Sequence, residues 1–494
     1  MSRTKTKQRM KADEVQEKDV SVRRGGKQIV LPDAMSYDEG IEWLHRKKEE
    51  EETYVSIREK VQAFPLDGAV ALAKVLQNRY GWANLVPRPG FFGPNPPTMI
   101  GVNIAHDKSI QVPWGDCQIP NIEGTISTSW TQDDGRPVFE IRAEVKRKHE
   151  KEIKDMADEV RQFVRKDSIY RGKGIKISFR DNDGERIDKF SPTHAPRFID
   201  MSKIDPDELI YPQDTMEIVK TTLFNPVERT ESCRHYGVPL KRGVLLEGPY
   251  GTGKTLCAYV LGYKCVQNDW TFLYLEDVRD LDMAMSFAKL YEPCVVFAED
   301  VDRATAGGRT AGMDKILNTL DGVDSKKHEI MVVLTTNDKR AIHPAFVRPG
   351  RIDAVIPILP PDNEATVRLV RSYGCDAQGN SMIDATDEQL AASVEPLVGA
   401  NAAFIREAVE RAKLSAVAHC DPGANGNLKI TAEDIAVAAK SMAAHLSLVN
   451  PNGDGPGIDP MGLVLGAVRC FAKPGLSLAP LADEFTFRGH PLFE

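Results

Sequence analysis

A glycine-rich segment of the sequence has the residue types and spacing of a phosphate-binding loop. It reads G-x-x-x-x-G-K-T over residues 248–255, between an apolar run at 243–247 and a helical pattern that follows. Glycines let such a loop turn its backbone N–H groups toward a phosphate, and the helix adds the positive end of its dipole. The predicted nucleotide-binding residues are Gly248, Pro249, Tyr250, Gly251, Thr252, Gly253, Lys254, Thr255 and Leu256.

Two side chains of this loop carry specific chemistry. Lys254 supplies a mobile positive charge for the β- and γ-phosphates of a nucleotide. The hydroxyl of Thr255 is suited to ligate Mg²⁺. The loop therefore predicts binding of a nucleoside triphosphate together with Mg²⁺.

An acidic cluster follows a second apolar run, residues 294–298, and begins with Glu299 and Asp300. Open sheets of parallel strands bind ligands at the carboxyl ends of their strands, so these carboxylates are expected near the phosphate loop. One carboxylate of the cluster is expected to hold Mg²⁺, directly or through water, and its neighbour to orient and deprotonate an attacking water molecule. The predicted metal ligands are Thr255 and Glu299.

A third apolar run, residues 329–335, leads to Asn337, whose amide is expected to hold the attacking water. Eleven residues later, Arg348 and Arg351 lie three positions apart in a short turn. A guanidinium group suits the spread negative charge of a phosphoryl-transfer transition state, because its planar fork donates several hydrogen bonds at once. Taken alone, the two arginines also fit a surface salt bridge with Asp353. The predicted catalytic residues are Glu299, Asp300, Asn337, Arg348 and Arg351.

The elements that must position these residues alternate in type. Apolar strand runs and helical stretches succeed one another from residue 241, which predicts an α/β P-loop fold, a parallel sheet with helices on both faces. We assign this large subdomain to residues 224–361 and a small α-helical lid to the Ala-rich residues 362–445. Residues 191–223 resemble a linker. Residues 446–494 contain seven Gly and six Pro, which predicts a loop or docking arm.

A separate α+β domain is expected over residues 31–190, as the part that selects a substrate or partner. Its elements are predicted from hydrophobic periodicity, as helices at 37–60 and 144–166 and as strands at 99–105, 124–130 and 174–179. Residues 1–30 contain nine Lys or Arg against four Asp or Glu and few large apolar side chains, so we expect a flexible basic tail.

Composition narrows the class of protein. The 494 residues carry a net charge of −8, with 41% hydrophobic residues, as expected of a soluble chain of several domains. No apolar stretch reaches the ~18 residues that a membrane-spanning helix needs, and the first residues lack the apolar core of a secretory signal. The eight cysteines show no zinc or disulfide spacing. We therefore expect a cytoplasmic protein with no membrane span.

As a set, these residues resemble the AAA ATPases in the narrow sense, the branch of the AAA+ superfamily with the second region of homology. The resemblance covers about residues 205–445 and rests on the order of its motifs. These are the lead-in and Walker A loop at 224–255, Leu320-Asp321-Gly322, the sensor 1 segment Thr335-Thr336-Asn337, the arginine-finger segment 343–353 and the sensor 2 segment Gly399-Ala400-Asn401. The resemblance implies ATP and Mg²⁺ as cofactors. It also implies a ring, usually a hexamer, in which Arg348 and Arg351 reach into the neighbouring subunit's site.

The sequence departs from that family in two places. The family's Walker B motif ends in Asp-Glu, whereas this chain has Glu299-Asp300. The family also carries an aromatic pore loop between its second and third strands, where residues 274–282 are shorter and acidic. The first departure bears on the rate of hydrolysis and the second on whether a client is threaded through the ring.

Three functions fit these sequence features. The first is a ring motor that hydrolyses ATP to remodel, unfold or disassemble a protein or protein complex. The second is a DNA-associated loader or translocase that contacts nucleic acid through the basic tail, although the acidic net charge counts against it. The third is a nucleotide-gated scaffold with little hydrolysis, in which bound ATP stabilises the assembly by mass action.

Overall fold

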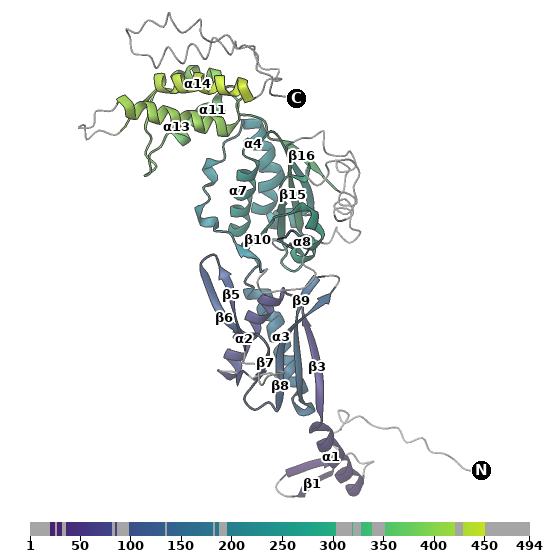
Figure 1. The fold of residues 1–494 in the computed structure, drawn as a ribbon. Helices are drawn as coiled ribbons and strands as arrows, with labels where there is room; N and C mark the ends of the chain where they lie inside the picture. The colour runs from purple at the N-terminus through teal and green to yellow at the C-terminus, as the bar shows by residue number, and fades with distance from the viewer. Residues whose placement is uncertain are drawn as a thin grey trace, which may run out of the picture. The chain divides into compact units, whose positions relative to one another are not determined.

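The computed structural model of the chain separates into two compact units. The amino-terminal unit comprises residues 1–170 and 182–195, and the large unit comprises 171–181 and 196–494. Figure 1 shows the fold. The structure describes residues 20–24, 27–31, 36–81, 84–85, 98–133, 136–180, 183–186, 195–302, 319, 328–337, 351–419 and 428–449, and every structural statement below concerns these residues.

The amino-terminal unit is built on an antiparallel sheet of five strands in the order β3-β9-β8-β7-β4. These strands are β3 (Tyr54–Val61), β4 (Asn84–Leu85), β7 (Asp116–Gln118), β8 (Gly124–Asp133) and β9 (Arg136–Lys146). Helices α2 (Pro65–Tyr80) and α3 (Glu150–Asp167) pack on each other and on this sheet. A second small sheet pairs β5 (Met99–Ala105) with β6 (Lys108–Pro113).

Two helices of this unit differ from the sequence prediction. The helix expected over 37–60 is α1 (Tyr37–Glu51), and β3 begins three residues later, because the side chains of 54–61 alternate between exposed and buried positions. The helix expected over 144–166 begins only at Glu150. Its first six residues belong instead to the end of β9 and to a 3₁₀ turn, η1 (Arg147–His149).

The predicted flexible tail is partly ordered. Its residues 20–24 and 27–31 form the antiparallel strands β1 (Val20–Arg24) and β2 (Lys27–Leu31). Valine and isoleucine at these positions favour strands, and two glycines stand between the two segments in the sequence. Residues 1–19 and 450–494 lie outside the described residues, as do the segments 303–318, 320–327 and 338–350.

The large unit contains a seven-stranded sheet in the order β11-β10-β13-β14-β15-β12-β16, parallel except for the edge strand β11. Its strands are β10 (Gly174–Ile177), β11 (Arg197–Phe198), β12 (Arg242–Glu247), β13 (Thr271–Leu275), β14 (Cys294–Ala298), β15 (Ile330–Thr336) and β16 (Ala354–Pro357). The central strands are buried on both faces, as a parallel sheet covered by helices requires. The predicted α/β P-loop fold is confirmed.

Helices pack on this sheet from the segments between its strands (Figure 1). Helix α7 (Lys254–Gln267) and helix α8 (Leu281–Ala288) both contact β13 and β14. Residues of α7 share one core cluster with alternate residues of the strands, among them Val244, Phe272 and Val295. The sheet and α7 thus form a rigid base for the segments that join them.

Two boundaries of the predicted domains are wrong. Strand β10, expected in the amino-terminal domain, pairs with β13 inside the large sheet, because strand periodicity does not say which sheet a strand joins. The segment 191–223 is no linker over its described part. It contributes β11 and the short helices η3 (Met201–Lys203), η4 (Pro206–Glu208), α4 (Gln213–Val219) and η5 (Lys220–Phe224), and it buries Met201, Leu209 and Leu223 in the core. Helices α5 (Asn225–Glu228) and α6 (Thr230–His235) follow.

The end of the described chain is helical, as predicted for the lid. It contains α11 (Asn363–Tyr373), α12 (Asp387–Ser393), the 3₁₀ turn η9 (Glu395–Leu397), α13 (Ala402–His419) and α14 (Ala432–Val449), with a small parallel pair of strands, β17 (Ile383–Asp384) and β18 (Ile430–Thr431). These helices have a core of their own, which includes Leu369, Ile405 and Ile435. Among the described helices of the whole chain, none is both long and apolar enough to cross a bilayer.

Candidate active site

The glycine-rich loop joins β12 to α7 at the carboxyl edge of the parallel sheet. Gly251 and Gly253 have φ angles of 76° and 93°, a region that side chains other than glycine rarely adopt. The buried Thr252 hydroxyl donates to the carbonyl of Pro249 at 2.9 Å, and the Tyr211 hydroxyl donates to the carbonyl of Gly253 at 2.9 Å. These bonds fix the loop around the first turn of α7, where the helix presents free backbone N–H groups.

Lys254 lies at the centre of the loop, only 7% exposed. Its ammonium group donates to the carbonyls of Gly248 and Pro249, at 2.7 and 2.8 Å, and to Oδ1 of Asn337 at 2.8 Å. Burial lowers the pKa of Lys254, and the neighbouring carboxylates of Glu299, Asp300 and Asp302 oppose that shift. The cation is thus held by neutral oxygen atoms, which phosphate oxygens are suited to replace.

Glu299 directly follows β14 and is held by two hydroxyl groups. Thr255 donates to Oε1 of Glu299, and Tyr274 of β13 donates to Oε2 at 2.6 Å. Burial raises the pKa of Tyr274, and its hydrogen bond to Glu299 raises it further, so its hydroxyl remains a donor. The structure therefore brings together Thr255 and Glu299, the two predicted ligands of Mg²⁺.

Asp300 and Asn337 form the other half of the site. Asp300 has a φ of 52°, and its backbone N–H donates to the hydroxyl of Thr335 at 3.1 Å. The Asn337 amide donates from Nδ2 to Oδ1 of Asp300 at 2.8 Å, while its own Oδ1 accepts from Lys254. The predicted base and the predicted water-holding amide are therefore direct neighbours, and the amide connects them to the phosphate-loop lysine.

The lid contacts the phosphate loop through two hydrogen bonds. The Asn401 amide donates to the carbonyl of Tyr250 at 2.7 Å, and the backbone N–H of Ala403 donates to the carbonyl of Gly251 at 3.3 Å. The side chain of Tyr250 is 63% exposed, whereas Leu256 packs against the core of the sheet. Movement of the lid would therefore act directly on the phosphate loop.

The predicted arginine fingers are not part of this cluster. Arg351 precedes β16 at the opposite edge of the sheet, since Asp353 pairs with Gly243 at the start of β12. At ~3.3 Å per strand residue, that edge lies on the order of 20 Å from the phosphate loop of the same chain. Arg348 lies outside the described residues.

Comparison with known proteins places this site in a family. Residues 244–359 match the sequence model described as "ATPase family associated with various cellular activities (AAA)". The chain therefore contains an AAA domain over these residues. The matched residues include β12 from Val244 onward, the phosphate loop, Glu299, Asp300 and Asn337.

Relatives of this AAA chain cover part of its length. It is 27% identical over 231 residues to "26S proteasome regulatory subunit 8 homolog" of Schizosaccharomyces pombe, a match of 40% of this chain and 55% of the relative. It is 28% identical over 221 residues to "Probable 26S proteasome regulatory subunit 10B" of Caenorhabditis elegans, covering 38% and 53%. It is 30% identical over 183 residues to "Proteasome-activating nucleotidase" of Methanococcus maripaludis, covering 33% and 43%. The chain thus spans about half the length of these relatives.

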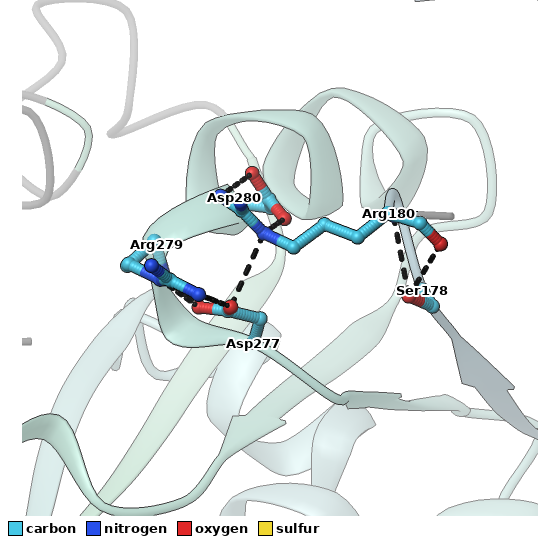
Figure 2. Close-up of polar contacts among 5 residues, drawn as sticks. All are labelled: Ser178, Arg180, Asp277, Arg279 and Asp280. Atoms are coloured by element: carbon cyan, nitrogen blue, oxygen red, sulfur yellow. Dashed lines mark hydrogen bonds and ion pairs between the residues drawn. The ribbon is translucent and has the colours of Figure 1, made fainter. Parts of the chain in front are cut away.

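The segment after β13 in this AAA domain is a short turn held by ion pairs (Figure 2). The turn is η6 (Val278–Asp280), which leads directly into α8. Arg180, which follows β10, donates from Nε to Oδ2 of Asp280 at 2.8 Å and from Nη2 to Oδ1 at 3.1 Å, and it pairs with Asp277 at 3.1 Å. Arg279 pairs with Asp277 as well.

This turn corrects one sequence assignment. Residues 274–282 were expected as a loop, yet Tyr274 and Leu275 belong to β13 and only the residues after them form the turn. The sequence reasoning therefore missed the Tyr274 hydroxyl as a partner of Glu299. The sequence contains a signal for this contact. Tyr274 is the fourth residue of the apolar run 271–275, and the next predicted strand, 294–298, is the one that Glu299 follows.

The donor set of the AAA site fits ATP and Mg²⁺. Magnesium prefers a few oxygen ligands from the protein together with phosphate oxygens and water. In the part of the chain that the structure describes, no group of three or more His, Cys, Asp or Glu side chains forms a metal cluster. Thr255 and Glu299 are the protein groups at hand for such an ion.

Proposed function

We propose that this chain hydrolyses ATP and uses the energy to remodel a protein or protein complex. The observation that carries the proposal is the cluster of Lys254, Asn337 and Asp300, in which one amide joins the phosphate-loop cation to a carboxylate at 2.8 Å on each side. Attack of water on a phosphate requires a cation that binds the phosphate and a base that accepts a proton from the water. Lys254 and Asp300 supply these two groups, and the neutral amide of Asn337 lies between them.

Each group has a distinct part in this reaction. Lys254 would exchange its two loop carbonyls for phosphate oxygens, and the glycine-rich backbone would donate its N–H groups to the same phosphates. Asn337 would orient the attacking water, and Asp300 would accept its proton. When bound between Thr255 and Glu299, Mg²⁺ would supply positive charge for the phosphates.

The active form is proposed to be a ring, with a hexamer as the expected stoichiometry. Arg351 lies at the edge of the sheet opposite the phosphate loop, so it would act on the site of a neighbouring subunit and not on its own. Arg348 is proposed to act beside it. The names of two relatives describe them as proteasome regulatory subunits, which supports a motor that acts on proteins.

Client selection is proposed for the amino-terminal unit. The three relatives match 40%, 38% and 33% of this chain, so each match leaves out more than half of it. The turn after β13 occupies the place where a loop that contacts the client would be expected. Ion pairs between Arg180 and the aspartates Asp277 and Asp280 hold this turn. We infer that contact with the client depends on the amino-terminal unit, and that the client is a protein.

The test is phosphate release as a function of protein concentration, with assembly followed by light scattering. We expect activity per subunit to rise as the protein assembles, and we expect Lys254→Ala, Asp300→Asn and Arg351→Ala each to abolish it. Arg229→Ala removes an exposed arginine of the same unit and serves as the control. A wild-type protein that assembles with ATP but releases no phosphate would instead support the nucleotide-gated scaffold.

Co-expression of two inactive variants tests the action in trans. A ring that mixes Lys254→Ala and Arg351→Ala subunits contains interfaces at which an intact Lys254 faces an intact Arg351. We expect such mixed rings to recover part of the activity, whereas each variant alone stays inactive. No recovery in verified mixed rings would place Arg351 in a role confined to its own subunit.

A further inference from the structure

The Glu299 carboxylate has both of its oxygens bonded by hydroxyl groups. Thr255, from the first turn of α7, donates to one oxygen, and Tyr274, from β13, donates to the other at 2.6 Å. The two donors come from different elements on either side of the carboxylate. Glutamate has three rotatable side-chain bonds, so an unsupported Glu299 would sample many orientations.

Tyr274 is itself held rigidly. Its backbone lies in the interior of the sheet, in register with Lys176 of β10 and Phe297 of β14. Its ring stacks on Tyr259 of α7 with centroids 6.0 Å apart and meets the edge of Phe297 at 5.4 Å. The ammonium group of Lys176 lies 5.1 Å from the ring centroid. The hydroxyl therefore has a fixed position before any ligand binds.

The length of the acidic side chain matters for this contact. The family's usual motif has aspartate at this position, whereas this chain has Glu299, which is one methylene longer. In this chain one oxygen of Glu299 accepts from Tyr274 and the other from Thr255. A tyrosine on β13 and a glutamate after β14 thus form a matched pair.

We propose that Tyr274 is a positioning residue, which orients the Glu299 carboxylate for Mg²⁺ in the nucleotide complex. The inference rests on the proposed function, because it assumes that Glu299 serves the metal. Partners that hydrogen-bond to a metal ligand fix its orientation, and their loss costs 10- to 100-fold in metal affinity. Tyr274 acts through Glu299 and does not itself touch the nucleotide.

The test measures binding of a fluorescent ATP analogue to the full chain over a series of Mg²⁺ concentrations and in EDTA. We expect Tyr274→Phe to raise the Mg²⁺ concentration for half-maximal binding about 10-fold, with affinity in EDTA unchanged. Tyr259→Phe removes a hydroxyl from the stacked neighbour and is expected to match the wild type. Equal Mg²⁺ dependence of Tyr274→Phe and wild type would overturn the inference.

A second variant separates positioning from packing. In Glu299→Asp the carboxylate is too short to reach Tyr274, so adding Tyr274→Phe is expected to cause no further shift in Mg²⁺ dependence. Full additivity of the two changes would mean that Tyr274 acts independently of Glu299, against the inference. Thermal unfolding of each variant shows whether it is folded.

Failure of this inference and failure of the proposed function would give different results. A wild-type chain that does not bind the ATP analogue at any Mg²⁺ concentration would overturn the proposed function at this site. A wild-type chain with Mg²⁺-dependent binding that Tyr274→Phe leaves unchanged would overturn only the role of Tyr274.

Discussion

Two polar clusters lie at the same edge of the large sheet and hold their cations in opposite ways. In the phosphate-loop cluster, Lys254 donates to neutral oxygens of Gly248, Pro249 and Asn337. In the ion-pair cluster, Arg180 donates two hydrogen bonds to the carboxylate of Asp280. A cation held by neutral acceptors is ready to exchange them for phosphate, whereas one already paired with a carboxylate is not.

The ion-pair cluster of Arg180, Asp277, Arg279 and Asp280 stabilises the fold, because one of its carboxylates is buried. Asp280 is 1% exposed, and Arg180 supplies its counter-charge in a bidentate geometry (Figure 2). Burial would raise the pKa of the neighbouring Asp277, but hydrogen bonds from Arg279 and the positive charges of Arg279 and Arg180 together lower it. Arg180, which follows β10, and the turn after β13 are thus occupied by their own ion pairs, whereas Asp300 and Asn337 lie beside the phosphate-loop lysine.

The largest expected effect is the loss of the phosphate-loop cation. Lys254→Ala should lower phosphate release and nucleotide affinity by on the order of 10³-fold, because the phosphates lose their principal cation. The free energy of unfolding should change little, since burial already disfavours this charge. Lys264→Ala on the same helix, whose partner is Glu228, is the control. Unchanged nucleotide affinity in Lys254→Ala would show that Lys254 does not bind the phosphates.

The second largest effect is expected on the free energy of unfolding. Arg180→Ala should lower the free energy of unfolding by about 3–5 kcal/mol, because it leaves the buried charge of Asp280 without its partner. Denaturant unfolding measures this change. The double variant Arg180→Ala/Asp280→Asn should recover part of the loss, because it removes the stranded charge. A double variant as unstable as the single one would argue against an electrostatic cause.

A smaller effect is expected at the amide between Lys254 and Asp300. Asn337→Ala should lower the rate of phosphate release about 10²-fold, because the attacking water loses an orienting group. Nucleotide affinity should stay within about threefold, since Lys254 keeps its loop position. Asn268→Ala, which removes an amide from the end of α7, is the control. A fall in affinity as large as the fall in rate would assign Asn337 to binding.

The smallest effect should come from the outer arginine of the ion-pair cluster. Arg279 is 56% exposed, so its pair with Asp277 is largely solvated. Arg279→Ala should change the free energy of unfolding by less than about 1 kcal/mol, and the change should shrink at high salt. A loss comparable to that of Arg180→Ala would show that the whole cluster, and not only the Arg180–Asp280 pair, fixes the turn.

The sequence predicts which residues lie together at the phosphate loop, because contiguous residues of one loop and the ends of apolar strands determine it, whereas their roles stay predictions. Glu299, Asp300 and Asn337 were expected together, and the structure places Asn337 within 2.8 Å of both Asp300 and Lys254. Tyr274 was missed, because a contact between side chains on adjacent strands depends on their register, which single-strand periodicity does not contain.

The same reason explains the wrong domain boundaries. The alternation at 174–177 predicts a strand, but its pairing with β13 is a long-range contact that the local pattern does not encode. The helix expected over 37–60 ended early, because charged residues at 46–52 fit a helix while the alternating residues after them fit a strand. The role of Arg351 stays a prediction, since it depends on a second subunit.

The placement of β10 has a consequence for how the protein can be divided. The chain leaves the amino-terminal unit at residue 171, returns to it at 182 and leaves again at 196, so three covalent connections join the two units. A fragment that starts at residue 196 would lack β10 and leave the edges of β11 and β13 unpaired. The two units are therefore not interchangeable modules, and exchange of the amino-terminal unit between relatives would have to include a strand of the large sheet.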